Sequence, residues 1–261
     1  MVPDSLLPST LLVLGIDTCG SSGTVALARV SGDAVEILGQ AELAGRSYSE
    51  RLIGAVGELL AGAQTRVGLL NAIVAVNGPG SFTGVRLGLS AVKGLAEPAR
   101  IPVVAVSRLA VLAGKTGLAG KIGLAHKAGL ASAALDAHRG EVFLRVGTEG
   151  GEAWELLAGA AELATLDRPA GPVALCDEAA AAALRAAWPA AVLVQTDAPT
   201  AADAIALAAP QLRAGAFVDL ALLDGHYLRR SDAEIFLHNK GQNEGRCEDQ
   251  DKCSSAGTMP A

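Results

Sequence analysis

The hydrophobic pattern in the first part of the chain alternates between continuous apolar runs and apolar residues with helical spacing. Short continuous runs are typical of buried strands, whereas apolar residues three and four apart indicate one face of a helix. Leu52, Val56 and Leu59 show the helical spacing, and Ser47 or Ser49 can cap that helix. The expected strands are 11–17, 23–30, 34–43, 72–77 and 101–107, and the expected helices are 47–63 and 81–97. This order predicts an α/β fold with a mixed sheet flanked by helices.

The second half of the chain repeats this pattern less clearly. The expected strands are 133–137, 140–147, 172–176 and 191–195, and the expected helices lie near 177–187 and 200–214. Between the two halves, the motif K-x-G-L-A begins at Lys115, Lys121 and Lys127. This period fits no helical stripe and the glycines disfavour a helix, so we expect a loop there.

These patterns predict two α/β domains and a tail. We expect an N-terminal domain over 1–110, a connector over 111–131 and a C-terminal domain over 132–236. The remainder, 237–261, is polar and nearly free of β-branched residues, which is typical of disordered chain.

The composition narrows the class of protein. The 261 residues are 51% hydrophobic but only 3% aromatic, so the core must be filled mainly by aliphatic side chains. The net charge of −6 gives no indication of a broad nucleic-acid-binding face. No apolar run has the length of a membrane span and the N-terminus lacks the features of a secretory signal. We therefore expect a cytoplasmic protein that binds no membrane, and its four scattered cysteines favour reduced thiols.

Several motifs of known enzyme classes do not occur in the sequence. The tripeptide G-K-T at 114–116 lacks the earlier glycine of a P-loop, and no G-x-S-x-G surrounds Ser22 or Ser81. The four histidines are far apart in the sequence, so no zinc ligand set is visible and we expect no metal.

The turn D-T-C-G-S-S-G, residues 17–23, joins the first two expected strands and has two interpretations. In one, it is a polar hairpin turn in which Asp17 accepts hydrogen bonds from local N–H groups. In the other, it is a phosphate hairpin, in which N–H groups and hydroxyls face a phosphate and the carboxylate holds a hydrated cation. Asp17, Thr18 and Gly23 are the candidate residues of that site.

A stripe of glycines marks the second expected helix. Gly80, Gly84 and Gly88 are four residues apart, and Ala91 and Leu95 continue the stripe. An anion needs only the first turn of a helix, whereas an interior glycine costs about 1 kcal/mol relative to alanine. The spacing therefore favours close packing of a second helix, either helix 48–63 of the same chain or a helix of a partner.

The chain resembles the TsaB (YeaZ) family, the dimerisation subunit of the bacterial machinery that makes threonylcarbamoyladenosine at position 37 of certain tRNAs. The resemblance covers 11–147 well, is weaker over 150–215 and returns at 226–234. Its most specific signals are G-P-G-S-F-T-G-x-R-x-G after a strand and D-x-x-R-G-E-V-[FY] at 136–143. The other matching segments are LGIDTCGSSGTVAL, GRSYSERL, IPVVAVSRLAVLA and HYLRRSDAE.

The resemblance implies two actin-like ATPase-type (ribonuclease H-like) domains related by duplication. It also implies a non-catalytic scaffold that supports threonylcarbamoyl transfer to adenosine 37 by a catalytic paralogue. That paralogue carries a metal-binding His-x-x-x-His pair, which does not occur in this sequence. The hairpin 17–23 would be a vestige of the superfamily's phosphate loop. The resemblance implies that no cofactor is required, although it is compatible with weak nucleotide binding.

The partners implied are the TsaD-like catalytic paralogue, a TsaE-like ATPase subunit, a second copy when the chain is alone, and tRNA indirectly. The family pairs through helices that correspond to 48–62 and 82–97. The expected interface residues are Tyr48, Leu52, Val56, Gly84, Arg86, Gly88 and Ala91. We expect five of them, Leu52, Val56, Gly84, Gly88 and Ala91, to form an exposed apolar stripe that a partner covers. We expect Gly88→Leu to abolish association while the fold stays intact.

Two alternative functions are weighed against the scaffold. A nucleotide-dependent phosphotransferase of the actin-like superfamily would use Asp17 together with a second carboxylate across a cleft, for which Asp136 is the candidate. A glycoprotease-like (M22-like) peptidase would need metal ligands or a nucleophile elbow that the sequence does not offer.

Overall fold

The structure is a computed structural model that describes residues 8–43, 48–118, 132–148 and 152–229. Residues 1–227 form one compact unit and residues 228–261 a second, and every helix and strand named below lies in the first. Lys121, Lys127 and the tail expected to be disordered, with Cys247 and Cys253, lie outside the described residues.

The first five-stranded sheet has the mixed topology that the hydrophobic pattern predicts. Its strands are β1 (Thr10–Asp17), β2 (Gly23–Ser31), β3 (Ala34–Leu43), β4 (Ala72–Val76) and β5 (Val103–Val106), in the order β3-β2-β1-β4-β5. The first three form an antiparallel meander, and β4 and β5 run parallel to β1. The carboxyl ends of β1, β4 and β5 therefore meet at one edge, which is where α/β sheets usually place their sites.

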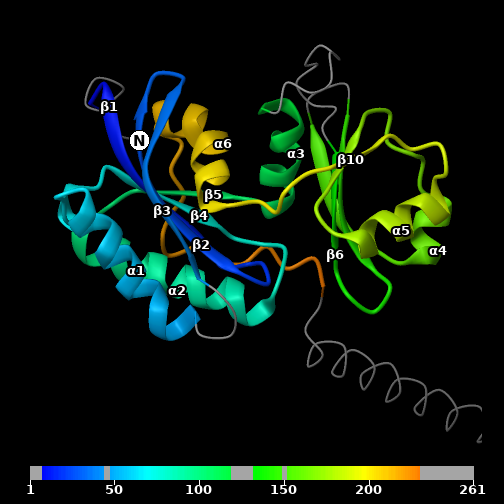
Figure 1. Cartoon of the computed structure of the whole chain (residues 1–261), viewed down its shortest axis with the longest axis horizontal. Helices are drawn as coiled ribbons and strands as arrows, with labels where there is room; N and C mark the ends of the chain where they lie inside the picture. Colours follow the sequence, from blue (N-terminus) through cyan, green and yellow to red (C-terminus); the bar gives the residue numbers. More distant parts are fainter. Residues whose placement is uncertain (1–7, 44–47, 119–131, 149–151, 230–261) are drawn as a thin grey trace, which may run out of the picture. The chain divides into compact units, whose positions relative to one another are not determined.

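Helices cover both faces of this sheet (Figure 1). On one face, α1 (Tyr48–Gly62) and α2 (Phe82–Ala99) lie side by side, and α6 (Ala201–Arg213) packs on the other. A short 3-10 helix, η2 (Val67–Leu69), precedes β4. Ser81 caps α2, because its hydroxyl accepts a hydrogen bond from the Gly84 N–H at 3.3 Å. The helix was expected to end at residue 97, but α2 ends at Ala99, so Pro98 lies within its last turn.

The second sheet repeats the topology of the first. Its strands are β6 (Ser132–Asp136), β7 (Val142–Gly147), β8 (Ala153–Ala158), β9 (Val173–Leu175) and β10 (Leu193–Gln195), in the order β8-β7-β6-β9-β10. The pairs β6–β7 and β7–β8 are antiparallel, and β9 and β10 continue parallel to β6. This repeated topology confirms the expected α/β class. The helices α4 (Ala160–Thr165) and α5 (Glu178–Ala187) pack with this sheet, and α3 (Arg108–Leu118) contacts β6 and β9.

Four elements differ from the sequence-based expectation. The helix α3 continues to Leu118, so the first K-x-G-L-A motif starts within a helix, where Lys115 pairs with Asp203 of α6 at 2.9 Å. The strand β8 and the helix α4 were not expected, because neither has a clear period and α4 has only six residues. The helix α6, expected with the second half, packs its apolar face into the first core.

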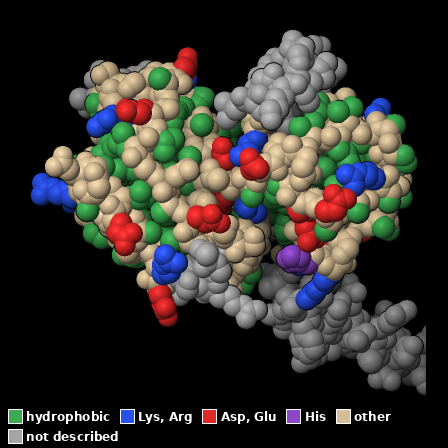
Figure 2. Space-filling model, in the orientation of Figure 1, with side chains coloured by type: hydrophobic (Ala, Val, Ile, Leu, Met, Phe, Trp, Pro, Cys, Tyr) green, Lys and Arg blue, Asp and Glu red, His purple; other side chains and the backbone are tan. Residues whose placement is uncertain are grey.

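On the face of the molecule seen in Figure 2, basic and acidic side chains of the described residues are interspersed. Among the described residues, no helix combines the length and the apolar character needed to cross a bilayer.

Candidate functional site

The turn after β1 lies at the sheet edge where the three parallel strands end. Asp17, the last residue of β1, is only 2% exposed. Its Oδ1 accepts a hydrogen bond from the Cys19 N–H at 2.8 Å, which is the local bond expected of a polar hairpin turn. The Cys19 thiol donates to the Val76 carbonyl at 3.3 Å, which ties the turn to the end of β4.

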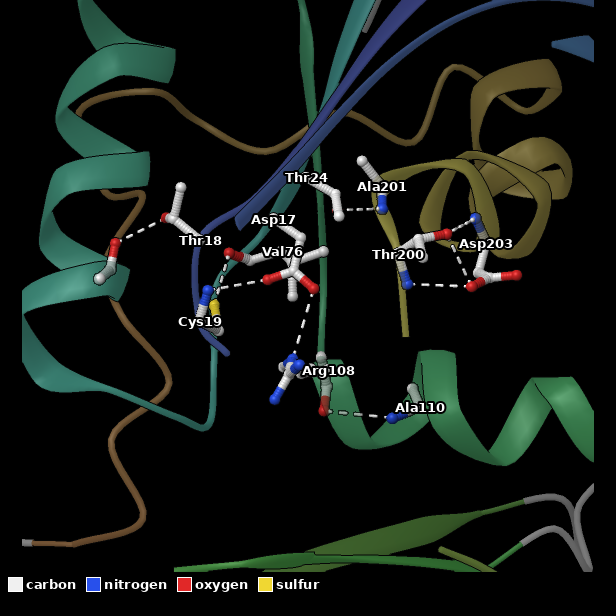
Figure 3. A network of polar contacts seen from close by, with 12 residues as sticks. Asp17, Thr18, Cys19, Thr24, Val76, Arg108, Ala110, Thr200, Ala201 and Asp203 are labelled. Atoms are coloured by element: carbon white, nitrogen blue, oxygen red, sulfur yellow. Dashed lines mark hydrogen bonds and ion pairs between the residues drawn. The ribbon is translucent and has the colours of Figure 1, made fainter. Parts of the chain in front are cut away.

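The second oxygen of Asp17 pairs with a residue that the sequence reasoning did not single out. Arg108 begins α3, and its N–H donates to the Gly78 carbonyl at 2.6 Å. Its Nε donates to Asp17 Oδ2 at 3.3 Å, and both side chains are nearly inaccessible to solvent. Burial alone would lower the pKa of Arg108, but the Asp17 carboxylate, together with Cys19 and Cys176, raises that pKa by more than burial lowers it. The guanidinium therefore stays charged beside the carboxylate (Figure 3).

Burial also raises the pKa values of the two cysteines in the described part of the chain, Cys19 and Cys176, which are both free thiols. Burial and the Asp17 charge raise the pKa of the Cys19 thiol well above its ordinary value. Burial raises the pKa of Cys176 as well. Both are therefore weak nucleophiles, since the thiolate is the reactive form.

The glycine stripe of α2 is filled by this turn and not by a helix. A Cβ at Gly80 would overlap the Cys19 carbonyl, and one at Gly84 or Gly88 would overlap Thr18. The Thr18 hydroxyl donates to the Gly84 carbonyl at 2.6 Å, and the Ser81 N–H donates to the Cys19 carbonyl at 2.9 Å. The expectation of helix-on-helix packing at the stripe is wrong, because the chain's own hairpin occupies the space.

The expected interface residues divide into buried and exposed ones. Leu52 and Val56 are buried, as are Gly84 and Gly88, so the expected exposed stripe is wrong for these four. Ala91 is half-buried and Arg86 is exposed. The Tyr48 side chain lies outside the described part of the structure. Because a side chain at Gly88 would meet Thr18, Gly88→Leu would disturb the hairpin as well as any association.

Other side chains of α1 and α2 do face solvent. Ile53 of α1 is 53% exposed and Phe82 of α2 is 43% exposed. The Arg86 guanidinium carbon lies 3.8 Å from the centre of the Phe82 ring, which is a cation–π contact. The Tyr227 ring lies beside that of Phe82, with a centroid separation of 5.3 Å and a tilt of 47° between the ring planes. We name Phe82, Arg86 and Tyr227 the aromatic cluster. The sequence signal for it was a Phe at the first position of a helix in a chain poor in aromatics.

The second carboxylate required by the phosphotransferase hypothesis is engaged locally. Asp136 Oδ1 accepts from the His138 N–H at 2.8 Å, and its Oδ2 lies 2.9 Å from His138 Nδ1. Its own N–H donates to Asp177 at 3.0 Å. The structure therefore places Asp136 in a local turn and Asp17 in an ion pair with Arg108.

A buried carboxylate joins segments from both halves of the chain. Glu155 of β8 has a side chain that is 7% exposed, and it accepts hydrogen bonds from Ser107 and Arg145, each at 2.8 Å. His226 Nε2 lies 2.9 Å from its other oxygen, and the His226 N–H donates to the Asn77 carbonyl at 2.7 Å. Burial works to raise the pKa of Glu155, but the hydrogen bonds from His226, Ser107 and Arg145 together lower it. This cluster was missed because its members are far apart in the sequence.

The polar groups at the start of the turn, in Asp17, Thr18 and the Cys19 backbone, are engaged within the chain and do not fit a metal–nucleotide ligand. The Thr18 hydroxyl, the Cys19 N–H and both Asp17 oxygens are already bonded within the chain. Gly23 serves as the first residue of β2. In the described ranges, no three His, Cys, Asp or Glu side chains are grouped so that they could hold a metal ion.

Comparison with known proteins shows to which family the chain belongs. The family described as "TsaD: tRNA N6-adenosine threonylcarbamoyltransferase" matches residues 39–213. Curated relatives named "tRNA threonylcarbamoyladenosine biosynthesis protein TsaB" match as well. The Escherichia coli protein is 35% identical over 131 residues, 50% of this chain and 52% of its own length. The Bacillus subtilis protein is 37% identical over 133 residues, 51% of this chain and 53% of its own length. The chain belongs to this family, on its TsaB branch.

A solved structure agrees with this TsaB assignment. A Pseudomonas aeruginosa protein described as similar to peptidase YEAZ has a TM-score of 0.66 and 26% identity, over 84% of this chain and 100% of its own. Against the curated TsaB sequences, the chain spans about half of the relatives' length.

Proposed function

We propose that this TsaB-family chain is a dimerisation and scaffold subunit that supports threonylcarbamoyl transfer to adenosine 37 of tRNA by a TsaD-like paralogue. The observation that carries the scaffold role is the aromatic cluster, in which Tyr227 lies against Phe82 and Arg86 of α2. Phe82 is exposed, and so is Ile53 of α1, the helix that packs beside α2. Phe, Tyr and Arg side chains are enriched in protein interfaces, and Tyr and Arg are enriched in their binding hot spots as well. The names of the TsaB relatives support the pathway.

The proposed role requires no catalytic residue in this chain. The carboxylate best placed for chemistry, Asp17, is buried in an ion pair, and the His-x-x-x-His pair of the catalytic paralogue does not occur in the sequence. Threonylcarbamoyl transfer would then take place on the paralogue, with no cofactor bound by this chain and tRNA contacted indirectly.

The proposed assembly has three protein components. The α1–α2 surface would bind the TsaD-like paralogue, and a second copy of the chain would occupy it when the paralogue is missing. A TsaE-like ATPase subunit would complete the assembly, which would act in the cytoplasm, where tRNA is modified.

Light scattering of the purified chain, alone and mixed with the paralogue, tests this proposal. Phe82→Ala should weaken both associations, because truncation of an interface aromatic removes a hot-spot contact. Trp154→Ala is the matched control, since Trp154 is also 43% exposed but lies on the second sheet. Equal association of wild type, Phe82→Ala and Trp154→Ala would contradict the proposed surface.

The pathway itself is tested in cells that lack their own TsaB. The chain should restore threonylcarbamoyladenosine in total tRNA, measured by nucleoside mass spectrometry, and Phe82→Ala should restore less. Failure of the folded wild-type chain to restore any, when co-expressed with its own paralogue, would contradict the proposed pathway.

A further inference from the structure

The turn 18–20 is enclosed on two sides by its own chain. On one side it packs into the glycine stripe of α2, where the Thr18 hydroxyl donates to the Gly84 carbonyl at 2.6 Å. On the other side lies Arg108, whose guanidinium would overlap a Cβ built at Gly20. Figure 3 shows Asp17, Cys19 and Arg108 together at this edge of the sheet.

The charges at the turn balance without any ligand. A phosphate hairpin needs a cation beside its carboxylate and free donors facing the phosphate. Here the cation beside Asp17 is the guanidinium of Arg108, held in place because the Arg108 N–H also donates to the Gly78 carbonyl at 2.6 Å. The Cys19 N–H donates to Asp17 itself, and the Thr18 hydroxyl donates to the Gly84 carbonyl, so both donors have partners inside the protein.

We propose that Arg108 is an internal cation that takes the place of a metal–nucleotide ligand at the hairpin and keeps the turn closed on α2. The inference goes beyond the scaffold role and holds for the isolated chain. It assigns Arg108 as a positioning residue: the arginine holds Asp17, and the turn that follows Asp17 holds the first half of α2, which carries Phe82 and Arg86. The geometry of that helix would therefore not depend on a nucleotide at this turn.

Removal of the guanidinium should turn this edge into a site for a free guanidinium ion. The variant Arg108→Ala leaves Asp17 buried without a counter-charge, which strongly destabilises a protein. A planar cation with forked donors can replace the missing group, whereas sodium lacks both the shape and the donors.

Thermal unfolding tests this prediction. The midpoint of Arg108→Ala should lie below that of the wild type, and low-millimolar guanidinium chloride should raise it relative to sodium chloride at the same ionic strength. Arg185→Ala is the matched control, because Arg185 also pairs with a carboxylate, Glu178, but both are exposed. Neither the wild type nor Arg185→Ala should respond. A folded Arg108→Ala that responds equally to both salts overturns the proposal.

A second measurement needs no substitution and no partner. The amide signals of residues 17–23 in the wild-type chain should not shift when MgATP is added, because Arg108 already fills the place of the ligand. Saturable shifts of those signals overturn the proposal, even where Arg108→Ala does not fold. Arg108→Lys keeps the charge but loses the fork, so its midpoint should fall between those of Arg108→Ala and the wild type. A failure of these tests would leave the association of Phe82 variants unaffected, so it is distinguishable from a failure of the scaffold role.

Discussion

Thr18 explains why α2 carries glycine at positions 84 and 88. Its carbonyl and its hydroxyl lie where a Cβ at those two positions would stand, and Thr18 itself is 1% exposed. The same helix carries Gly94, where a Cβ would meet nothing within 4 Å. A methyl group at Gly84 or Gly88 would thus overlap Thr18, whereas one at Gly94 would meet open space.

Alanine substitutions at these positions should have opposite effects on stability. Gly84→Ala should lower the free energy of unfolding by about 1–3 kcal/mol, because the added methyl group overpacks the contact with Thr18. Gly94→Ala should raise it by about 0.5–1 kcal/mol, because alanine loses less backbone entropy in a helix. Urea unfolding of both variants measures the difference. Equal effects would contradict the packing of the turn into α2.

The sequence predicted the close approach at this stripe but not what approaches. Glycine spacing shows which positions of a helix must be small, and any backbone can fill the space. Thr18 is more than sixty positions away along the chain, with no local pattern that connects it to Gly84. Arg108 was missed for a related reason: an arginine after a predicted strand usually lies on the surface, and only the folded chain brings it to Asp17.

At the scale of elements, Glu155 joins segments that no short-range pattern connects. Its carboxylate accepts hydrogen bonds from Ser107, which precedes α3, and from Arg145 of β7. It also contacts the ring of His226, which lies in the segment after α6 that packs against the turn at Gly78. A carbonyl of that segment lies 2.9 Å from a Cβ built at Gly78. The strand that carries Glu155 was itself not predicted, so the cluster could not be inferred. The longer strands and helices were predicted because their hydrophobic periods extend over several turns or alternations.

The Glu155 cluster makes stability depend on pH. Because its pKa in the folded protein lies below the ordinary value of 4.5, Glu155 stabilises the fold at neutral pH. That stabilisation is complete above the unfolded-state pKa and is lost as the pH falls through the lower, folded-state value. Glu155→Gln should therefore be less stable than the wild type by about 1–3 kcal/mol at neutral pH.

The difference between the wild type and Glu155→Gln should shrink as the pH is lowered below 4.5, measured by urea unfolding at a series of pH values. Glu178→Gln is the control, because Glu178 is exposed and its pairing with Arg185 contributes little. A difference that stays constant with pH would show that the carboxylate charge is not the stabilising group.

At the scale of the whole molecule, the first core is closed by a helix from the far end of the described chain. The buried face of α6 consists of Ala201, Ala204, Ile205, Ala208, Ala209 and Leu212. A Cβ at Gly15, in the middle of β1, would lie 2.7 Å from the Ala201 carbonyl and 3.0 Å from Ile205. Hydrophobic patterning predicted this helix, but its period does not tell which sheet the apolar face covers.

A fragment that ends before the second sheet should consequently fail to fold, although it contains every strand of the first. Residues 1–131 include β1 to β5 with α1, α2 and α3 but lack α6, so one face of the sheet would expose its apolar side chains to water. Residues 1–229 keep α6 and should fold. Circular dichroism with urea as denaturant measures both chains, and we expect a cooperative transition only for the longer one. A cooperative transition of the 1–131 fragment would show that the predicted domain 1–110 carries a sufficient core of its own, and that α6 is an addition to it.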